Sequence, residues 1–552
     1  MSRRATLIAL PHYTSQDFTV PMSSYRPKGP PPNIRELMAR GFRALSAGQF
    51  NEASTCCKLV LEQQPELAPA HFLVGLIGLA TDDRRTAQAA FAAVTQIEPG
   101  HAAAWAHLAK LLAEGGQVNR ADVALANAVK YEANDIPQVL DVIGTTYTLL
   151  GEHRTADDWY RRAAAGQPDD SALRINYANN LIYLGETALA EQELAAAFAL
   201  GRGHAQAHWL VAGLEKAADH QHLEEMQALL KGRPLPRRAL AFLHYAMGKE
   251  YEDLQEWQPA FDAFTRGARA RRATLTFDEQ LESDTFDTLG KLYTREWLAS
   301  RSPGNDDSAP IFIIGQPRTG TTLVERIVTA HSSVHSAGEL QQFGNCIRRL
   351  TRYDRQERFS PELFTQAQAV NPRVLGDEYL LRTTRLRGTL PRFVDKLPYN
   401  YLFLPHILAA LPRAKIIHLV RDPRDTCFSV FKQLFADAYP HSYNLEEMAR
   451  HFVRYYRLMA MWRERFPGRF LDVQYEDVVV NLEDNARRIL SYLELPWEDA
   501  CMEFHSQATA VSTASAVQVR EPAHSRSVGR WQRYETQLQP VLDILRSEGV
   551  AV

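Results

Sequence analysis

A turn-forming residue recurs at a nearly constant interval through the first two hundred residues of the sequence. Successive members lie 34, 34, 35 and 34 residues apart, at Gly48, Asp82, Gly116, Gly151 and Gly185. Two small residues, twelve positions apart, recur in each interval: Gly41/Ala53, Gly75/Ala87, Ala109/Ala121, Gly144/Ala156 and Ala178/Ala190. Two short helices pack closely where small side chains occupy their crossing point. A fixed period of this length therefore predicts stacked helix–turn–helix units.

This pattern resembles the tetratricopeptide repeat. Five units cover about residues 34–204, and a sixth fits near 241–274, whereas residues 205–240 are apolar at helical spacing but depart from the consensus. The resemblance implies an all-α superhelix whose concave face binds an extended peptide or another domain. We expect a flexible leader over 1–33 and a repeat domain over 34–300, with a peptide or protein as partner.

Composition excludes several classes of protein. The 552 residues carry a formal net charge of -3, which argues against a strongly basic nucleic-acid binder. The five cysteines are scattered and lack CxxC spacing, so we expect neither a disulfide framework nor a cysteine-built zinc site. The apolar run 5–10 ends at Pro11, and no stretch reaches the roughly 18–20 apolar residues that span a bilayer. We expect a cytoplasmic protein that binds no membrane.

The pattern changes after a polar segment, 301–309, that reads as a linker. Short apolar runs at 311–314, 393–394, 416–420 and 470–473 alternate with helical stretches such as 443–465 and 482–494. This alternation predicts an α/β domain over 310–552 with a mostly parallel sheet. Ligands of such sheets bind beyond the carboxyl ends of the strands, so the residues that follow each run are the candidates.

The first run ends in GQPRTGTT, residues 315–322, which nearly matches the phosphate loop GxxxxGK[ST]. Its glycines allow the backbone to fold around an oxyanion, and the following helix offers free N–H groups. Thr321 replaces the lysine that nucleoside triphosphatases use, which argues against ATP or GTP hydrolysis. The loop predicts a cradle for one or two phosphates, with Arg318 as an added cation. The alternative is a glycine turn between a strand and a helix.

The run 416–420 is followed by Arg421 and, eight residues later, Ser429. An arginine at a strand end and a hydroxyl two turns into the next helix can hold a second phosphate. The alternative is an ordinary Arg–Asp pair that caps the helix, because Asp422 and Asp425 lie between them.

Together the two patterns resemble the sulfotransferase family, whose donor is 3′-phosphoadenosine 5′-phosphosulfate. The resemblance implies a P-loop-like α/β sulfotransferase domain. It also implies that Arg421 and Ser429 hold the 3′-phosphate. The residues implied to cradle the 5′-phosphosulfate are Arg318, Thr319, Gly320, Thr321 and Thr322.

Residues 309–535 look, more specifically, like the protein-tyrosine sulfotransferase branch. The segment 336–339, SAGE, stands where that branch has its catalytic glutamate, and 395–398, DKLP, matches a strand end that carries a lysine. The resemblance implies Glu339 and Lys396 as catalytic residues. It also implies donor contacts from Tyr475, Ser515 and Arg530. The branch has an arginine twelve residues after the first arginine of the 3′-phosphate pair, and here Gln433 stands in that place with Lys432 beside it.

Sulfuryl transfer requires an in-line acceptor oxygen and neutralisation of developing charge. Arg318 and Lys396 supply cations, so no metal is required, and Glu339 accepts the acceptor's proton. His331 and His335 are rival bases, although His331 at a helix end also suits the helix dipole. We interpret His331 as structural.

The resemblance implies an enzyme that depends on 3′-phosphoadenosine 5′-phosphosulfate (PAPS) and sulfates an acceptor hydroxyl. At the level of the family, the expected acceptor is a tyrosine of a peptide or protein that the repeats recruit. Small phenols, carbohydrates and lipids are alternative acceptors. A repeat scaffold with a non-catalytic nucleotide-binding domain and a P-loop phosphotransferase are alternative functions.

Overall fold

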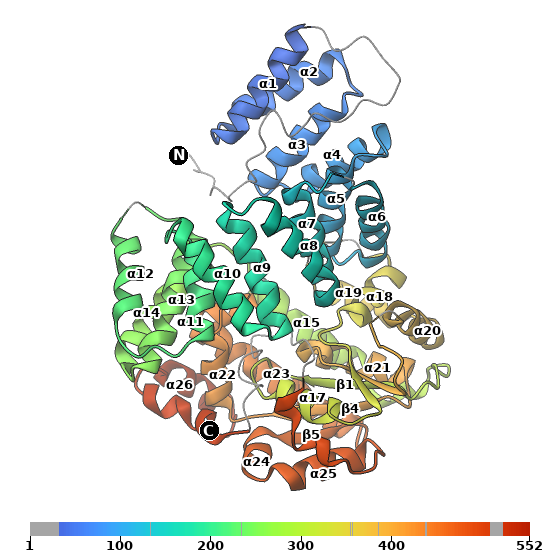
Figure 1. Cartoon of the computed structure of the whole chain (residues 1–552). Helices are drawn as coiled ribbons and strands as arrows, with labels where there is room; N and C mark the ends of the chain where they lie inside the picture. Colours follow the sequence, from blue (N-terminus) through green and yellow to red (C-terminus); the bar gives the residue numbers. More distant parts are fainter. Residues whose placement is uncertain are drawn as a thin grey trace. The chain divides into compact units, whose positions relative to one another are not determined.

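The computed structural model describes residues 32–132, 134–232, 234–353, 355, 357–384, 386–435, 439–507 and 523–552. The chain divides into two compact units, residues 1–180 and 181–552, which we describe separately (Figure 1). The first unit consists of helical repeats. The second contains further helices and then an α/β domain.

The helices of the first unit form antiparallel pairs with the predicted period. They are α1 (Pro32–Ser46), α2 (Phe50–Gln63), α3 (Ala68–Ala80), α4 (Arg84–Ile97), α5 (Ala102–Glu114), α6 (Val118–Tyr131), α7 (Pro137–Leu149), α8 (His153–Gly166) and the start of α9 (Ser171–Leu184). The predicted turn residues all adopt positive φ, from 57° at Asp82 to 85° at Gly151. The predicted turns are therefore confirmed, because this conformation favours glycine and tolerates aspartate.

Small residues occupy the crossing points, as predicted. A Cβ atom on Gly75 would lie 2.5 Å from Cε1 of Phe91, so only glycine fits there. Ala53, Ala87 and Ala121 are fully buried. The close approach of the paired helices depends on these positions, because overpacking a tight contact is destabilising.

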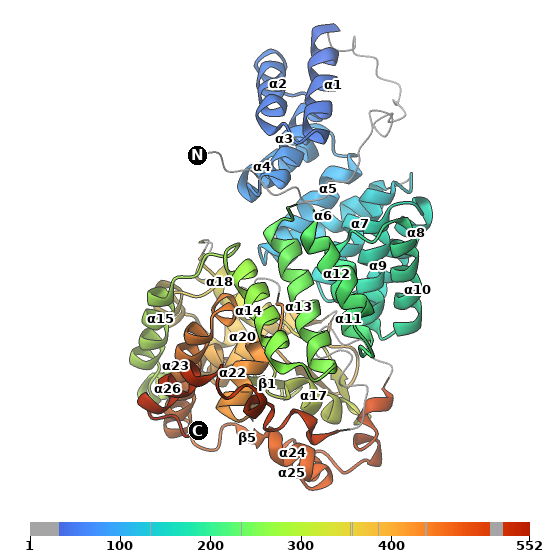
Figure 2. The same ribbon diagram turned by 90° about the vertical axis from the view of Figure 1, so that its left-hand side faces the viewer.

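The second unit begins with α10 (Thr187–Leu200), α11 (Ala205–Leu214), α12 (Gln221–Lys231), α13 (Arg237–Asp253), α14 (Trp257–Arg272), α15 (Glu279–Leu292) and α16 (Arg295–Ala299). Helices α13 and α14 lie side by side (Figure 2) and form the predicted sixth repeat unit. Gly248 packs against Phe264 at their crossing, and Gln255 turns between them with a φ of 62°. Helices α11 and α12, in the segment that departs from the consensus, are only 10 and 11 residues long.

A five-stranded parallel sheet forms the centre of the α/β domain. Its strand order is β2-β3-β1-β4-β5, with β1 (Pro310–Gly315), β2 (Val334–Ser336), β3 (Arg392–Asp395), β4 (Lys415–Val420) and β5 (Leu471–Gln474). Four strands coincide with the predicted apolar runs. The three-residue β2 was not predicted, because VHS has no apolar run and its pairing with β3 is a tertiary contact.

Helices cover both faces of the sheet (Figures 1 and 2). Phe312 and Ile314 belong to the core on one face, and Ile311 and Ile313 to the core on the other, as expected for a strand buried on both sides. The covering helices are α17 (Thr321–Thr329), α18 (Gln342–Leu350), α19 (Pro361–Ala367), α20 (Pro372–Thr383), α21 (Leu404–Ala410), α22 (Pro423–Phe431), α23 (Leu445–Arg465), α24 (Tyr475–Val480), α25 (Leu482–Tyr492) and α26 (Gln539–Ser547). Short 3-10 turns include η7 (Arg530–Tyr534).

Helices α13–α15 pack directly onto the α/β domain. The hydroxyl of Tyr245 donates to the carbonyl of Phe431 (3.0 Å), and Arg272 forms a two-pronged ion pair with Glu447 (3.0 and 3.1 Å). Arg454 pairs with Glu282 of α15. The last helices of the repeat region therefore form one compact unit with the sheet, which sequence periodicity alone did not predict.

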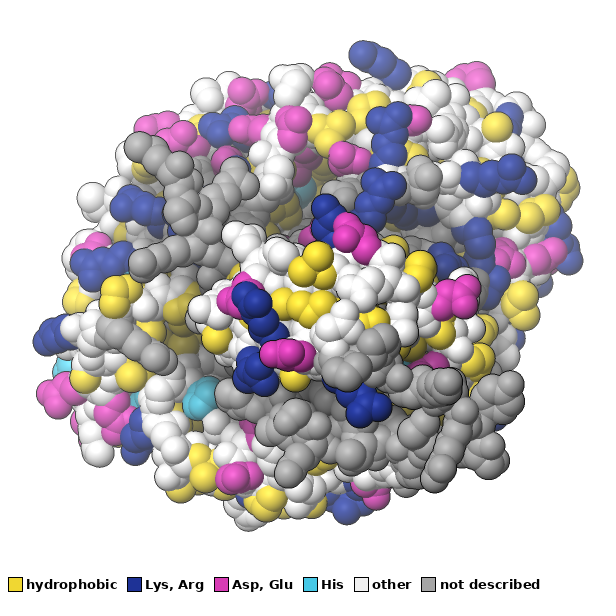
Figure 3. All heavy atoms as spheres, turned by 90° about the horizontal axis from the view of Figure 1, so that it is seen from above, with side chains coloured by type: hydrophobic (Ala, Val, Ile, Leu, Met, Phe, Trp, Pro, Cys, Tyr) yellow, Lys and Arg dark blue, Asp and Glu magenta, His cyan; other side chains and the backbone are white. Residues whose placement is uncertain are grey.

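Charged side chains of both signs are interspersed over the face drawn in Figure 3. This agrees with the near-zero net charge of the sequence. Among the described residues, no helix combines the length and the apolar character that crossing a membrane requires.

Candidate active site

The loop after β1 begins the candidate site. Gly315 and Gly320 have positive φ, and a Cβ on Gly320 would lie 2.4 Å from Cδ2 of Tyr475, so the ring packs directly on the loop. Arg318 also has a positive φ, of 66°, which costs a residue with a side chain about 1–3 kcal/mol. Backbone strain of this kind is typical of functional loops, and α17 begins immediately after Gly320.

A relay of polar side chains supports this loop from α15. Gln316 lies 3.1 Å from Nε2 of His451, and Nδ1 of His451 lies 2.9 Å from Glu282 Oε1. Gln316 and His451 are both buried. A helix that precedes the α/β domain in the sequence therefore helps to hold the second residue of the loop.

Arg421, at the end of β4, lies against the same loop. It donates to the carbonyl oxygens of Arg318 (2.8 Å) and Ser527 (2.5 Å), and its guanidinium lies 4.7 Å from the ring centre of Tyr475. Asp425 lies 3.9 Å from Arg421 and accepts hydrogen bonds from the backbone of Gly529 and Trp531. The segment around residues 527–531 is thus held against the start of α22.

A buried carboxylate from α13 completes this cluster. Glu252 accepts hydrogen bonds from Arg530 Nη2 (2.8 Å), Lys432 Nζ (2.9 Å) and the hydroxyl of Tyr534 (2.9 Å). Lys432 and Arg530 lower the pKa of Glu252 although burial opposes this. Glu252 is 4% exposed, so it is a buried anion inside a group of cations.

The cluster has the properties of an anion site. Burial lowers the pKa of Arg318 to about 10, and repulsion from Arg421 and Arg530 adds to the effect. The Nε atoms of Arg421 and Arg530 are buried donors without a hydrogen-bond partner among the described residues. Buried donors are nearly always satisfied in native proteins. Phosphate oxygens would satisfy both and relieve the repulsion between the arginines.

A second cluster lies at the ends of β2 and β3. Lys396 follows β3, is 1% exposed, and places its ammonium 2.5 Å from Glu339 Oε1 and 3.9 Å from Glu325 Oε2. Burial raises the pKa of Glu325, and the hydroxyl of Ser336 donates to its other oxygen (2.8 Å). The more exposed Glu339 is a candidate proton acceptor, held next to a buried cation.

Asp395 lies directly before Lys396 and is fully buried. Burial raises its pKa to about 8, although the hydroxyl of Tyr379 donates to it at 2.9 Å. Burial thus favours the protonated form of this carboxyl group, whose hydrogen bonds with Tyr379 and Asn400 anchor the end of β3.

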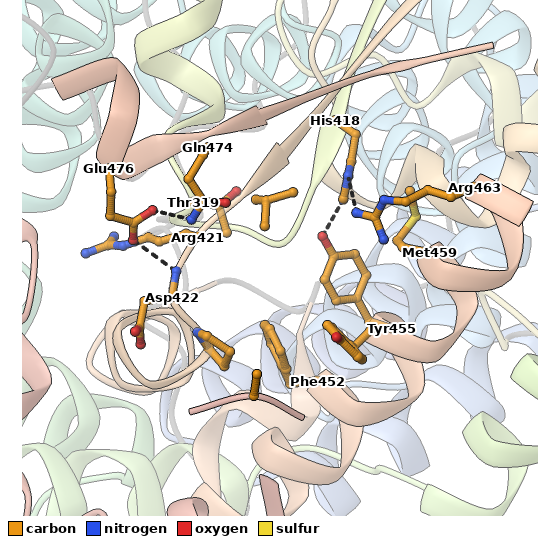
Figure 4. Close-up of a pocket in the computed structure, with 14 residues that line it drawn as sticks. Thr319, His418, Arg421, Asp422, Phe452, Tyr455, Met459, Arg463, Gln474 and Glu476 are labelled. Carbon is orange, nitrogen blue, oxygen red and sulfur yellow. Dashed lines mark hydrogen bonds between the residues drawn. The ribbon is translucent and has the colours of Figure 1, made fainter. Parts of the chain in front are cut away.

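A cavity of about 380 Å³ opens beside the loop (Figure 4). Its lining includes Thr319 and Arg421. His418 also lines it and bridges Asp472 (2.6 Å) and Tyr455 (2.5 Å). Glu339 and Lys396 do not line this cavity.

The structure brings most predicted site residues to one edge of the sheet. Each of the five strands has a predicted residue at or just beyond its carboxyl end: Arg318 after β1, Glu339 after β2, Lys396 after β3, Arg421 after β4 and Tyr475 after β5. Thr321 and Thr322 are buried in the first turn of α17, and Ser429 is buried on α22. Ser515 lies outside the described residues.

Two other sequence hypotheses concern histidines. Both ring nitrogens of His331 interact with backbone: Nδ1 accepts from Ser333 (3.1 Å) and Nε2 lies 3.1 Å from the carbonyl of Pro496. This agrees with a structural role. The ring of His335 packs against Gly388.

Sequence reasoning missed three carboxylates that surround the site: Glu252, Glu282 and Glu325. No local motif marks the first two, which lie in repeat-region helices. Glu325 lies four residues after Thr321, so its position on the same face of α17 was a usable signal.

Comparisons with known proteins found matches in both parts of the chain. Residues 310–499 match the model of the sulfotransferase family, and residues 79–144 match that of the tetratricopeptide repeat. The helical part of the chain thus contains a match to the tetratricopeptide repeat, and its α/β domain contains a match to the sulfotransferase family.

Several curated proteins are similar in sequence. An uncharacterized protein of Aquifex aeolicus is 30% identical over 339 residues, which are 60% of this chain and 44% of that protein. A putative protein-tyrosine sulfotransferase of Caenorhabditis briggsae is 26% identical over 40% of this chain and 80% of its own length. The protein-tyrosine sulfotransferase of Drosophila melanogaster is 24% identical over 41% of this chain. The chain spans less than half of the Aquifex and Drosophila proteins.

Solved structures with partial likeness include the sulfotransferase domain of the Synechococcus PCC 7002 olefin synthase. It has a TM-score of 0.31 and 20% identity, and the match covers 46% of this chain and 98% of that one. The sulfotransferase STF9 from Mycobacterium avium has a TM-score of 0.28 and 14% identity over 62% of this chain and 96% of its own.

Proposed function

We propose that this protein transfers a sulfuryl group from 3′-phosphoadenosine 5′-phosphosulfate to the hydroxyl of a tyrosine in a peptide or protein. The observation that carries the proposal is the anion site. The buried Arg421 and the half-buried Arg318 and Arg530 lie near one another beside the loop after β1, and the Nε atoms of Arg421 and Arg530 have no partner among the described residues. The family match supports sulfuryl transfer as the reaction.

In this proposal the donor's phosphates bind to the loop 315–320 and to Arg421, Ser429 and Arg530. The acceptor oxygen forms a bond to sulfur while the bond from sulfur to the bridging phosphate oxygen breaks, which releases adenosine 3′,5′-bisphosphate. Arg318 neutralises the charge that develops on the leaving phosphate.

Glu339 accepts the acceptor's proton, and Lys396 orients it and stabilises negative charge between donor and acceptor. Because Lys396 is paired with Glu339 in the structure, this role requires donor binding to draw Lys396 away from Glu339. Glu325 lies 3.9 Å from Lys396 and is a second acidic group beside it.

The tyrosyl acceptor is supported by similarity to proteins named protein-tyrosine sulfotransferase in two nematodes and a fly. Tetratricopeptide repeats provide a surface suited to an extended peptide, so we propose that they recruit the acceptor. Phenols, carbohydrates and lipids are the competing acceptors.

Calorimetric titration of adenosine 3′,5′-bisphosphate into the full chain tests the donor site, with ATP as the control. We expect micromolar binding without magnesium and no binding of ATP. Transfer of labelled sulfate from the donor to a tyrosyl peptide, compared with the same peptide carrying phenylalanine, then tests the acceptor. Absence of bisphosphate binding would favour a non-catalytic scaffold. Magnesium-dependent ATP binding would favour a phosphotransferase.

A further inference from the structure

Lys432 lies at the end of α22 in an unusual environment for a lysine. Its ammonium is 2.9 Å from Glu252 Oε2 and 3.2 Å from Glu252 Oε1, and its side chain is only 15% exposed. The two residues are 180 positions apart in the sequence. Buried lysines are rare unless they are paired or functional.

The position of Lys432 directs it toward the anion site. It follows Ser429 by three residues, so the two side chains project from the same side of this turn. Arg318 lies near enough to help lower the pKa of Lys432. An ammonium has three N–H groups, and the two oxygens of Glu252 account for two of them. The ammonium also lies 5.3 Å from the ring centre of Phe428, and among the described residues the third N–H has no oxygen or nitrogen partner. That N–H group can bind an anionic ligand.

Glu252 binds several groups of the donor site at once. It accepts from Lys432 on α22, and from Arg530 and Tyr534 on η7. One carboxylate of repeat helix α13 thus fixes cations from two separate segments of the sulfotransferase domain. Pairing with a carboxylate also opposes the loss of a proton from a buried ammonium.

We propose that Lys432 is a donor-binding cation, and that Glu252 is a positioning residue that keeps Lys432 charged and directed at the donor's phosphates. The proposal rests on the proposed function. It gives helix α13 an indirect role in donor binding through Lys432. It also places a cation next to Gln433, whose own side chain is uncharged.

The charged and titratable groups around Lys432 set its response to pH. They are Glu252 on α13, Arg318 on the loop after β1, and Arg530 and Tyr534 on η7. Burial, together with Arg530 and Arg318, lowers the pKa of Lys432 to about 8, and Glu252 opposes this shift. Removing the charge of Glu252 therefore lowers the pKa of Lys432, and the lysine loses its proton at a lower pH.

The test is calorimetric titration of adenosine 3′,5′-bisphosphate into the full chain at several pH values from 7.0 to 9.5. We expect the wild-type affinity to fall as pH rises through about 8. Lys432→Met should weaken binding about 10- to 100-fold at pH 7.0, as expected for a lost charged hydrogen bond. Lys432→Arg should abolish the decrease in affinity with rising pH, because a guanidinium stays charged throughout this range.

Glu252→Gln should shift the fall in affinity to lower pH. In the double variant Lys432→Arg/Glu252→Gln the shift should vanish, because no lysine is left to titrate, whereas a merely structural defect would persist. Glu494→Gln is the matched control. Glu494 pairs with Lys415 (2.6 Å), which lies at the start of β4, the end opposite to Arg421. It should leave affinity and pH profile unchanged.

Wild-type affinity in Lys432→Met would overturn this inference while leaving the proposed function intact. A pH profile in Glu252→Gln identical to wild type would remove Glu252 from its positioning role. If the wild type itself fails to bind the bisphosphate, the proposed function and this inference are both contradicted.

Discussion

The ammonium of Lys396 lies 2.5 Å from Oε1 of Glu339 and 3.9 Å from Oε2 of Glu325, so one buried lysine lies close to two acidic side chains. The two carboxylates differ in exposure: Glu339 is 34% exposed and Glu325 is 6% exposed. This difference divides their roles in the proposed reaction. The more exposed carboxylate, that of Glu339, can reach an acceptor, whereas Glu325 lies in the interior beside the lysine.

Substitution of either member of the Lys396–Glu339 pair should separate chemistry from binding. We expect Glu339→Gln to lower the transfer rate about 10²–10⁴-fold, the range for loss of a general base. Lys396→Ala should lower it at least about 10²-fold through lost charge stabilisation. The bisphosphate should still bind to both variants in calorimetry.

The control for this pair is Lys415→Ala, which removes a lysine from a more exposed ion pair at the start of β4. It should leave the rate unchanged. A wild-type rate in Glu339→Gln would show that another group accepts the proton.

Arg421→Ala should weaken binding of adenosine 3′,5′-bisphosphate by about 1.5–3 kcal/mol, because it removes a charged hydrogen-bond donor from the anion site. Titration calorimetry measures the change. Arg413→Ala, an exposed arginine in the turn before β4, is the control and should bind normally. Unchanged affinity in Arg421→Ala would exclude Arg421 from the donor site.

Gly320→Ala should disrupt the loop after β1. The new methyl group would lie 2.4 Å from the ring of Tyr475, and alanine is strained at a φ of 94°. We expect loss of donor binding and a decrease in the free energy of unfolding of about 1–3 kcal/mol. Gly203→Ala, where a Cβ meets no atom within 4 Å, should change neither quantity. Denaturant unfolding measures the stability of both variants, and calorimetry measures their donor binding. Equal stability and equal binding in the two variants would contradict the role of the loop.

The buried carboxyl of Asp395 should make stability depend on pH. Its pKa is about 8 in the folded protein and near the ordinary value of 3.8 when unfolded, so the folded state binds the proton more tightly. Raising the pH from about 4 to 8 therefore costs stability, by at most about 1.4 kcal/mol per pH unit from this group.

Asp395→Asn removes this titration, and an asparagine oxygen can still accept from Tyr379. We expect its unfolding free energy to change less between pH 5 and 8 than that of the wild type. Asp499→Asn, at an exposed position, is the control. Parallel pH curves for wild type and Asp395→Asn would contradict the proposed protonation.

Local patterns predicted much of the fold because their causes are local. The recurrence of Gly48, Asp82 and Gly116 reflects a backbone conformation that glycine and aspartate tolerate, and it predicted the turns directly. The apolar runs at 311–314 and 416–420 predicted β1 and β4, because strands buried on both faces need continuous apolar sequence. Strand β2 escaped prediction because its three residues are strands only through pairing with β3.

The candidate site was predictable where a motif combines a strand end with a charged or glycine-rich loop. Arg318, Lys396, Arg421 and Tyr475 follow strands, and parallel strands bring their carboxyl ends to one edge. The Lys396–Glu339 ion pair could not be predicted from spacing, since it joins residues 57 positions apart.

Sequence patterns were sufficient to predict the repeat architecture, the α/β domain and the edge of the sheet where the cations lie, because each depends on periodicity or on residues adjacent to a strand. The positions of Glu252, Glu282 and Glu325 around that edge became visible in the folded structure alone. A buried carboxylate is stabilised by whichever cations lie nearest in space, and for Glu252 these are Lys432 and Arg530, which lie 180 and 278 positions away in the chain.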